Sequence, residues 1–154
     1  DADYKTTLDT GEKEQTMIKL IIGVKGTGKT KTLINLVNEA LDKTEGSVLC
    51  IEKGTKLIHE IKYTARLVNT DEYNIMDAAD LFGFVAGAIA SNHDLTDIFI
   101  DSALKICNER IETFTDFVNR IDAFANAHNI NVVMTASMPE DKLPASLNQY
   151  VIAH

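Results

Sequence analysis

The chain has few cysteines, prolines and arginines and lacks tryptophan, so it does not have the composition of a small domain held together by disulfides or a structural metal. Its 154 residues include two cysteines, two prolines, three arginines and no tryptophan. Cys50 and Cys107 each lie in an apolar stretch without the spacing of a metal site. We therefore interpret both as reduced, buried thiols and expect neither a disulfide framework nor a zinc ribbon.

Long apolar runs and an excess of positive charge are also missing. The longest weakly polar run, residues 81–90, has about half the length that a membrane span requires. With no signal peptide visible, the expectation is a cytoplasmic protein without a membrane partner. The net charge is −8. An acidic surface repels phosphate backbones, so nucleic acid is not an expected partner.

The composition that is present is that of one globular domain. Hydrophobic residues make up 45% of the chain and charged residues 25%, and 154 residues suffice for a single core. Residues 1–16 differ, because they contain five acids, two lysines and almost nothing apolar. We interpret this stretch as a polar tail, an artificial extension or an extended arm, and place the folded domain at residues 17–154.

Short apolar runs alternate with helical periodicities from Met17 onward. The patterns predict strands at 17–22, 47–52, 65–69, 97–101, 131–136 and 150–153, and helices at 29–42, 77–92 and 102–128. Residues 53–63 fit neither pattern. Gly83 and Gly87, one helical turn apart, are expected to permit close helix packing. Strands joined by helices imply a three-layer α/β/α sandwich with a mostly parallel sheet, in which ligands bind beyond the carboxyl ends of the strands.

Three of the eight glycines lie within six residues, between an expected strand and an expected helix. They belong to the stretch GVKGTGKT at 23–30, the spacing of a phosphate-binding loop. Backbone N–H groups that wrap a phosphate need dihedral angles that glycine adopts cheaply, and the start of the helix adds further donors. The predicted binding residues are Gly23, Val24, Lys25, Gly26, Thr27, Gly28, Lys29, Thr30 and Lys31.

Two side chains of this loop have specific predicted roles. The Lys29 ammonium can reach the outer phosphates of a bound polyphosphate and counts as a catalytic residue. The Thr30 hydroxyl can ligate Mg²⁺, a cation that keeps several waters and needs few protein ligands.

The stretch resembles the Walker A motif of P-loop NTPases, and the resemblance covers about residues 17–136. The sequence GTGKT is similar to the corresponding motif of AAA-type ATPases, and the chain also resembles small bacterial P-loop ATP-binding proteins. ParA-like and MinD-like ATPases carry a signature lysine at the position of Val24, which sets that branch aside. The resemblance implies ATP, or another nucleoside triphosphate, with Mg²⁺ as cofactors.

The same resemblance suggests where the metal ligand and the catalytic base lie. Asp101 ends the stretch DIFID, as a Walker B aspartate does, and would hold the metal beside Thr30; the alternative is that it caps the following helix. Ser102 occupies the position of the catalytic glutamate in many P-loop ATPases. RecA-like members instead carry the base where Glu52 lies, and the alternative for Glu52 is a surface carboxylate paired with Lys53.

Two further features separate the candidate functions. Thr135 and Ser137 lie where related ATPases carry a γ-phosphate sensor, and Arg66 is the arginine most available as a finger. The favoured function is a slow or partner-dependent Mg-ATPase of RecA-like type, with an oligomer or a protein partner supplying an arginine. The alternatives are a non-hydrolysing nucleotide-dependent sensor or adaptor and, because no arginine-rich lid is visible, less favourably a small-molecule kinase.

Overall fold

The computed structural model describes residues 16–154, so all but one residue of the predicted polar tail lies outside the described chain. One parallel sheet has the strand order β3-β2-β4-β5-β1-β6. The strands are β1 (Ile18–Gly23), β2 (Ser47–Glu52), β3 (Arg66–Asn69), β4 (Leu95–Ile100), β5 (Asn131–Ser137) and β6 (Val151–Ala153). The helices are α2 (Lys29–Lys43), α3 (Ala78–Ser91), α4 (Ala103–Ile106) and α5 (Ile111–His128), with 3-10 turns at Thr70–Tyr73, Glu140–Lys142 and Ala145–Tyr150.

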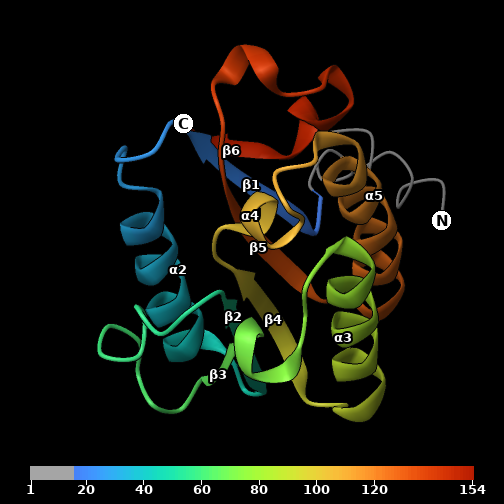
Figure 1. The fold of residues 1–154 in the computed structure, drawn as a ribbon. Coiled ribbons are helices and arrows are strands. Elements are labelled where there is room, and N and C mark those ends of the chain that lie inside the picture. Colours follow the sequence, from blue (N-terminus) through green and yellow to red (C-terminus); the bar gives the residue numbers. More distant parts are fainter. Residues whose placement is uncertain (1–15) are drawn as a thin grey trace, which may run out of the picture.

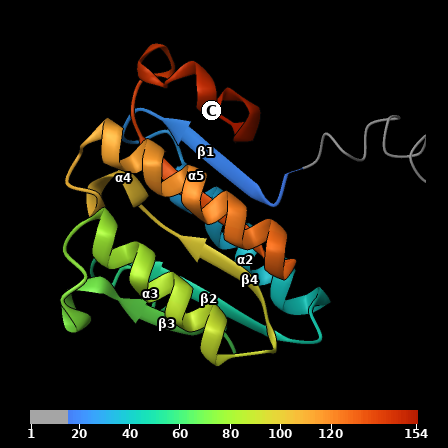
Figure 2. The same cartoon turned by 90° about the vertical axis from the view of Figure 1, so that its right-hand side faces the viewer.

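Helices cover both faces of the sheet, which confirms the predicted three-layer α/β/α sandwich. Helix α2 lies on one face, and α3 and α5 lie side by side on the other (Figures 1 and 2). Two apolar cores result, because alternate strand residues point to opposite faces. In β1, Ile21 packs with the buried side chains of α2, and Leu20 and Ile22 pack in the core under α5.

Each helix has a local cause in the sequence. In α2, Leu33 and Val37 are buried one turn apart, and the helix follows a left-handed Gly28. Asp77 caps α3 by accepting a hydrogen bond from the backbone N–H of Asp80. The apolar side of α5 is buried through Phe114 and neighbouring residues at helical spacing. No helix among residues 16–154 combines the length and apolarity needed to cross a membrane.

Two sequence-based expectations about the helices are wrong. The single helix expected at 102–128 is two helices, because Asn108 and Glu109 both adopt positive φ angles of 61° and turn the chain between α4 and α5. Gly83 and Gly87 do not permit close helix packing, since a Cβ atom added at either would meet nothing within 4 Å in the described chain. Both glycines are exposed, so their side of α3 is open.

Parallel pairing brings the carboxyl ends of the strands to a single edge. The loop after β1 lies at this edge, and β5 separates β1 from β4. The residues that follow β1, β2, β4 and β5 therefore meet there, which is the edge where ligands bind in sheets of this kind.

Candidate functional site

The loop between β1 and α2 has the backbone of an anion cradle. Gly26 and Gly28 have φ angles of 89° and 84°, in a region that side chains other than glycine adopt at a cost. No side chain caps the start of α2, so its first N–H groups point out of the helix end without a side-chain partner. At Gly23 the reason for glycine is space, because a Cβ atom would come within 2.7 Å of the Thr27 hydroxyl.

A hollow of about 470 Å³ lies over this loop. Its wall combines the phosphate-loop residues with residues that follow β4 and residues in the last part of β5. Among residues 16–154, five lysines and two carboxylates line it: Lys25, Lys29, Lys31, Lys56 and Lys105, with Asp101 and Glu109. In a chain of net charge −8, this concentration of cations makes the hollow locally basic.

Lys29 lines this hollow and is largely buried. Its side chain is 9% exposed, and its ammonium donates a hydrogen bond of 2.9 Å to the carbonyl of Val24. Within the described chain no carboxylate forms an ion pair with it. Burial lowers the pKa of Lys29, and the charge of Asp101 acts in the opposite direction. An anionic ligand would supply the partner that the loop itself does not.

Asp101 joins the loop to the neighbouring strands. It follows β4 directly and is 6% exposed. Its carboxylate accepts a hydrogen bond of 2.7 Å from the Thr135 hydroxyl, and the Thr30 hydroxyl lies 3.2 and 3.3 Å from its two oxygens. The Thr135 hydroxyl in turn accepts a bond from the backbone N–H of Ser102. The capping alternative for Asp101 is wrong, since Ser102 is the N-cap of α4 and no side chain caps that helix.

The donor set at this point suits a hard cation. Thr30 and Asp101 present a hydroxyl and a carboxylate to each other, and oxygen ligands are those that Mg²⁺ prefers. No group of three or more His, Cys, Asp or Glu residues suited to a metal occurs in the part of the chain that the structure describes. Mg²⁺ commonly binds through one or two protein oxygens plus substrate phosphates and water, so the residues present fit this cation.

Glu52 lies at the end of β2 but does not line the hollow. It is 2% exposed, and its two carboxylate oxygens accept hydrogen bonds from the backbone N–H groups of Lys56 (3.1 Å) and Leu57 (3.0 Å). Burial raises the pKa of Glu52, although these two bonds act against the rise. The surface-pair alternative is wrong, because Lys53 pairs with Asp71 at 2.7 Å.

The remaining sequence-based candidates divide between two places. Thr135 and Ser137 both line the hollow. Arg66 does not: it begins β3 at the edge of the sheet and lines a different cavity. None of the three arginines lines the hollow, so an arginine finger has no source within this chain as it is folded here.

Sequence reasoning missed three charged residues of the hollow. Lys56 lies in the stretch that fitted neither strand nor helix. Lys105 and Glu109 were part of the expected long helix, and the turn at Asn108 and Glu109 redirects them. Asn108, six residues beyond the predicted helix start at 102, was the signal available, since asparagine adopts positive φ more readily than most residues.

Comparison with known proteins gives a likeness of fold. No family model matches the chain, and no curated protein sequence matches it. Among solved structures, it is similar to the flagellar accessory protein FlaH from Methanocaldococcus jannaschii. The TM-score is 0.57, the identity is 14%, and the match covers 94% of this chain and 76% of that chain. At this identity the likeness concerns the fold alone, a parallel α/β sandwich.

The site can therefore be described by what its own residues can do chemically. Free N–H groups at a helix start, a buried lysine and four further lysines favour a ligand with several negative charges. The adjacent hydroxyl and carboxylate favour a divalent cation beside that ligand. Both features lie at the edge of the sheet where the fold brings four strand ends together.

Proposed function

We propose that the chain binds ATP, or another nucleoside triphosphate, together with Mg²⁺, and hydrolyses it slowly or only with a partner. The observation that carries this proposal is the charge of the hollow: five lysines and two carboxylates over an uncapped helix start, in an otherwise acidic chain. A triphosphate chain offers the matching charge, and backbone N–H groups at helix starts bind phosphates.

The proposed roles follow from position. Residues 23–31 wrap the phosphates, and the Lys29 ammonium exchanges its bond to the Val24 carbonyl for one to the outer phosphates. Thr30 and Asp101 hold Mg²⁺, which would neutralise charge on the phosphate oxygens. Thr135 keeps the Asp101 carboxylate oriented.

For hydrolysis we propose Glu52 as the general base, on the strength of its place at the end of β2. Burial raises its pKa, which increases its affinity for a proton taken from water. Both its oxygens hold the loop at Lys56 and Leu57, so activity requires that loop to move. Glu109, which lines the hollow, is the competing carboxylate.

A non-hydrolysing sensor or adaptor is the second candidate. It is favoured by Ser102, which follows Asp101 where a glutamate would serve as base, and by the engagement of Glu52 with its own loop. Only the hydrolysing candidate needs an arginine, and a partner or another copy of the chain would have to supply it, since none of the chain's own arginines lines the hollow.

The test is titration calorimetry with ATP and Mg²⁺, followed by a phosphate-release assay. We expect Lys29→Ala to weaken ATP binding at least tenfold, because the buried cation at the phosphates is lost. Lys43→Ala is the matched control: it removes an exposed lysine from the far end of the same helix, and binding should stay within twofold of wild type. No heat with any nucleoside triphosphate would refute the proposed function.

Turnover separates the two candidates. If Glu52 is the base, Glu52→Gln abolishes phosphate release but keeps ATP binding, and Glu109→Gln leaves release unchanged. Loss of release in Glu109→Gln alone would move the role to that residue. Binding without any release by wild type, alone or at high protein concentration, supports the sensor.

A further inference from the structure

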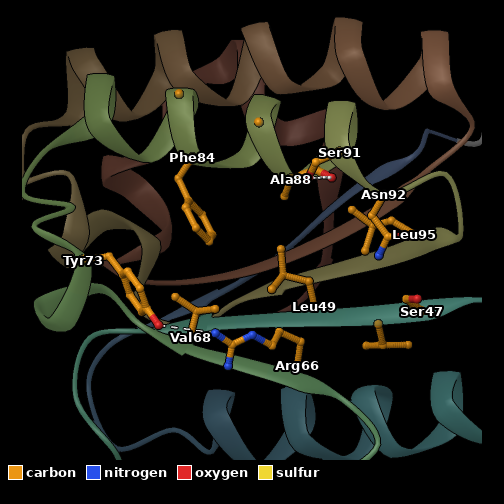
Figure 3. A pocket seen from close by; sticks show the side chains of 13 residues that line it. Ser47, Leu49, Arg66, Val68, Tyr73, Phe84, Ala88, Ser91, Asn92 and Leu95 are labelled. Carbon is orange, nitrogen blue, oxygen red and sulfur yellow. Dashed lines mark hydrogen bonds between the residues drawn. The ribbon is translucent and has the colours of Figure 1, made fainter.

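A second cavity shares no lining residue of the described chain with the hollow over the phosphate loop. It has a volume of about 520 Å³ and opens between α3 and the strands β2 and β3 (Figure 3). Its lining residues include Leu49, Val68, Phe84, Gly87 and Arg66. Cavities of about 300–1,000 Å³ are the size of small-molecule sites.

The cavity has an apolar floor and an apolar roof. Leu49 and Val68 rise from β2 and β3, and Phe84 and Ala88 point from α3 toward the sheet (Figure 3). Helix α3 carries a single charged residue, Asp80, although much of its surface is not covered by α5. A helix with so few polar residues is ordinarily covered on its open side as well.

The two glycines of α3 line this cavity and have no packing reason to be there. Each is in regular helix, where glycine costs about 0.5–1 kcal/mol relative to alanine, and a Cβ at either would meet nothing within 4 Å. Because they have no side chains, they leave empty a part of the cavity that other residues at these positions would fill.

Arg66 is the one charged residue of the described chain that lines the cavity, whose other polar lining residues are Ser47, Tyr73, Ser91 and Asn92. Its guanidinium donates to the Tyr73 hydroxyl at 3.3 Å and to the carbonyl of Leu67 at 3.4 Å, and within residues 16–154 it forms no ion pair. In a chain with 23 acids, an arginine left without a carboxylate at the mouth of an apolar cavity is complementary to an acidic ligand.

We propose that this cavity binds a small apolar molecule with one acidic group. The acid pairs with Arg66, and the apolar body lies between Phe84 and the strand residues. Medium-chain fatty acids represent this ligand class. The site is independent of nucleotide binding, so each proposal can fail without the other.

The test uses octanoate as the probe, with 1-octanol as its uncharged match, in titration calorimetry on the full chain. Wild type should bind octanoate saturably at one site. Arg66→Gln should weaken octanoate about fivefold or more and 1-octanol less than twofold, because only the acid loses its partner. Gly87→Leu should fill the cavity and weaken both ligands at least tenfold.

Ala90→Leu is the control for Gly87→Leu, since it adds the same side chain to an exposed position of α3 that does not line the cavity. It should bind octanoate within twofold of wild type, and both leucine variants should keep ATP binding unchanged. If Gly87→Leu fails to fold, the contrast between octanoate and 1-octanol in Arg66→Gln still decides.

Three results would overturn the proposal. They are no saturable octanoate binding by wild type, equal octanoate binding by wild type and Gly87→Leu, and equal loss of octanoate and 1-octanol in Arg66→Gln. A wild-type dimer that Gly87→Leu dissociates would also overturn it, and would assign this face to a second copy of the chain.

Discussion

At the scale of single residues, the Thr135 hydroxyl connects two parts of the site. It donates to Asp101 and accepts from the backbone N–H of Ser102, and it is 2% exposed. We predict that Thr135→Val lowers the free energy of unfolding by about 1–3 kcal/mol, because a buried N–H loses its partner while the side-chain shape is kept. Urea unfolding measures this loss.

Thr135→Ser distinguishes the hydroxyl from the methyl group. It keeps both hydrogen bonds and removes one buried methyl, which should cost about 1 kcal/mol. Mg²⁺-dependent ATP binding should be weakened in Thr135→Val and near wild type in Thr135→Ser, since only the hydroxyl orients Asp101. Equal affinities in the two variants would show that Thr135 does not position the carboxylate.

Glu52 makes stability depend on pH in a direction that can be worked out. Burial raises its folded-state pKa above the ordinary value of 4.5. Between pH 4.5 and the folded-state pKa, the folded state therefore binds more protons than the unfolded state. The contribution of Glu52 to stability is therefore greatest below pH 4.5 and is lost as the pH rises through the folded pKa. We predict that wild type loses stability relative to Glu52→Gln over this range, measured by urea unfolding between pH 4 and 8.

Glu109→Gln is the control for this pH dependence, because Glu109 is exposed and its replacement should leave the slope of wild type intact. A wild-type curve parallel to that of Glu52→Gln at every pH would contradict the prediction. The sequence placed Glu52 at the right strand end, but it could not show that the chain after β2 turns back and brings two N–H groups onto the carboxylate.

At the scale of secondary-structure elements, replacing either glycine of α3 by alanine should stabilise the protein. We predict that Gly83→Ala and Gly87→Ala each raise the free energy of unfolding by about 0.5–1 kcal/mol, because both are helical and the added methyl meets no atom. Thermal and urea unfolding measure the gain.

Gly46 supplies the contrast, since it joins α2 to β2 where an added Cβ would collide with the carbonyl of Asp94. Gly46→Ala should destabilise the protein. Destabilisation by the α3 variants as well would mean that their open side is closed in solution.

The strand and helix positions could be predicted closely because their signals are local. Predicted and observed bounds of β1, β2, α2 and α3 agree to within one residue, since apolar periodicity and flanking glycines set them. The turn between α4 and α5 was missed because Glu109, unlike glycine, gives no signal of a positive φ. The fold class could be predicted from the alternation of strands and helices. Missing the turn between α4 and α5 does not change this alternation, because both helices lie between β4 and β5 in the sequence.

At the scale of the whole molecule, the hollow is a product of strand order. Local patterns predict the strands that carry the phosphate loop and Asp101, but they do not fix that β5 lies between β1 and β4. This order brings Thr135 to Asp101, and it brings Lys56, in the segment after β2, and Lys105, in α4, to the same hollow. The basic charge of the site therefore arises from assembly, and a count of lysines along the acidic chain does not reveal it.

A ligand that binds this hollow should raise the stability of the whole folded chain. The hollow is lined by residues after β1 and β4 and by the end of β5, so a ligand that binds it binds the folded state and not the unfolded chain. At ATP and Mg²⁺ concentrations 100 times the dissociation constant, the gain is about 2.7 kcal/mol. At about 2–4 °C per kcal/mol for a domain of this size, we predict a rise in Tm of roughly 5–10 °C.

Three controls locate this stabilisation. At the same ATP concentration, Lys29→Ala should show about half the wild-type shift or less, since a tenfold weaker affinity leaves about half of the gain. Lys43→Ala should keep the full shift, and chelation of Mg²⁺ should reduce the shift of wild type, since Thr30 and Asp101 then contribute no metal bridge. An equal rise in wild type and Lys29→Ala would place the nucleotide elsewhere on the surface. The fold would then carry this hollow without using it for phosphate, and the five lysines would need another anion as their ligand.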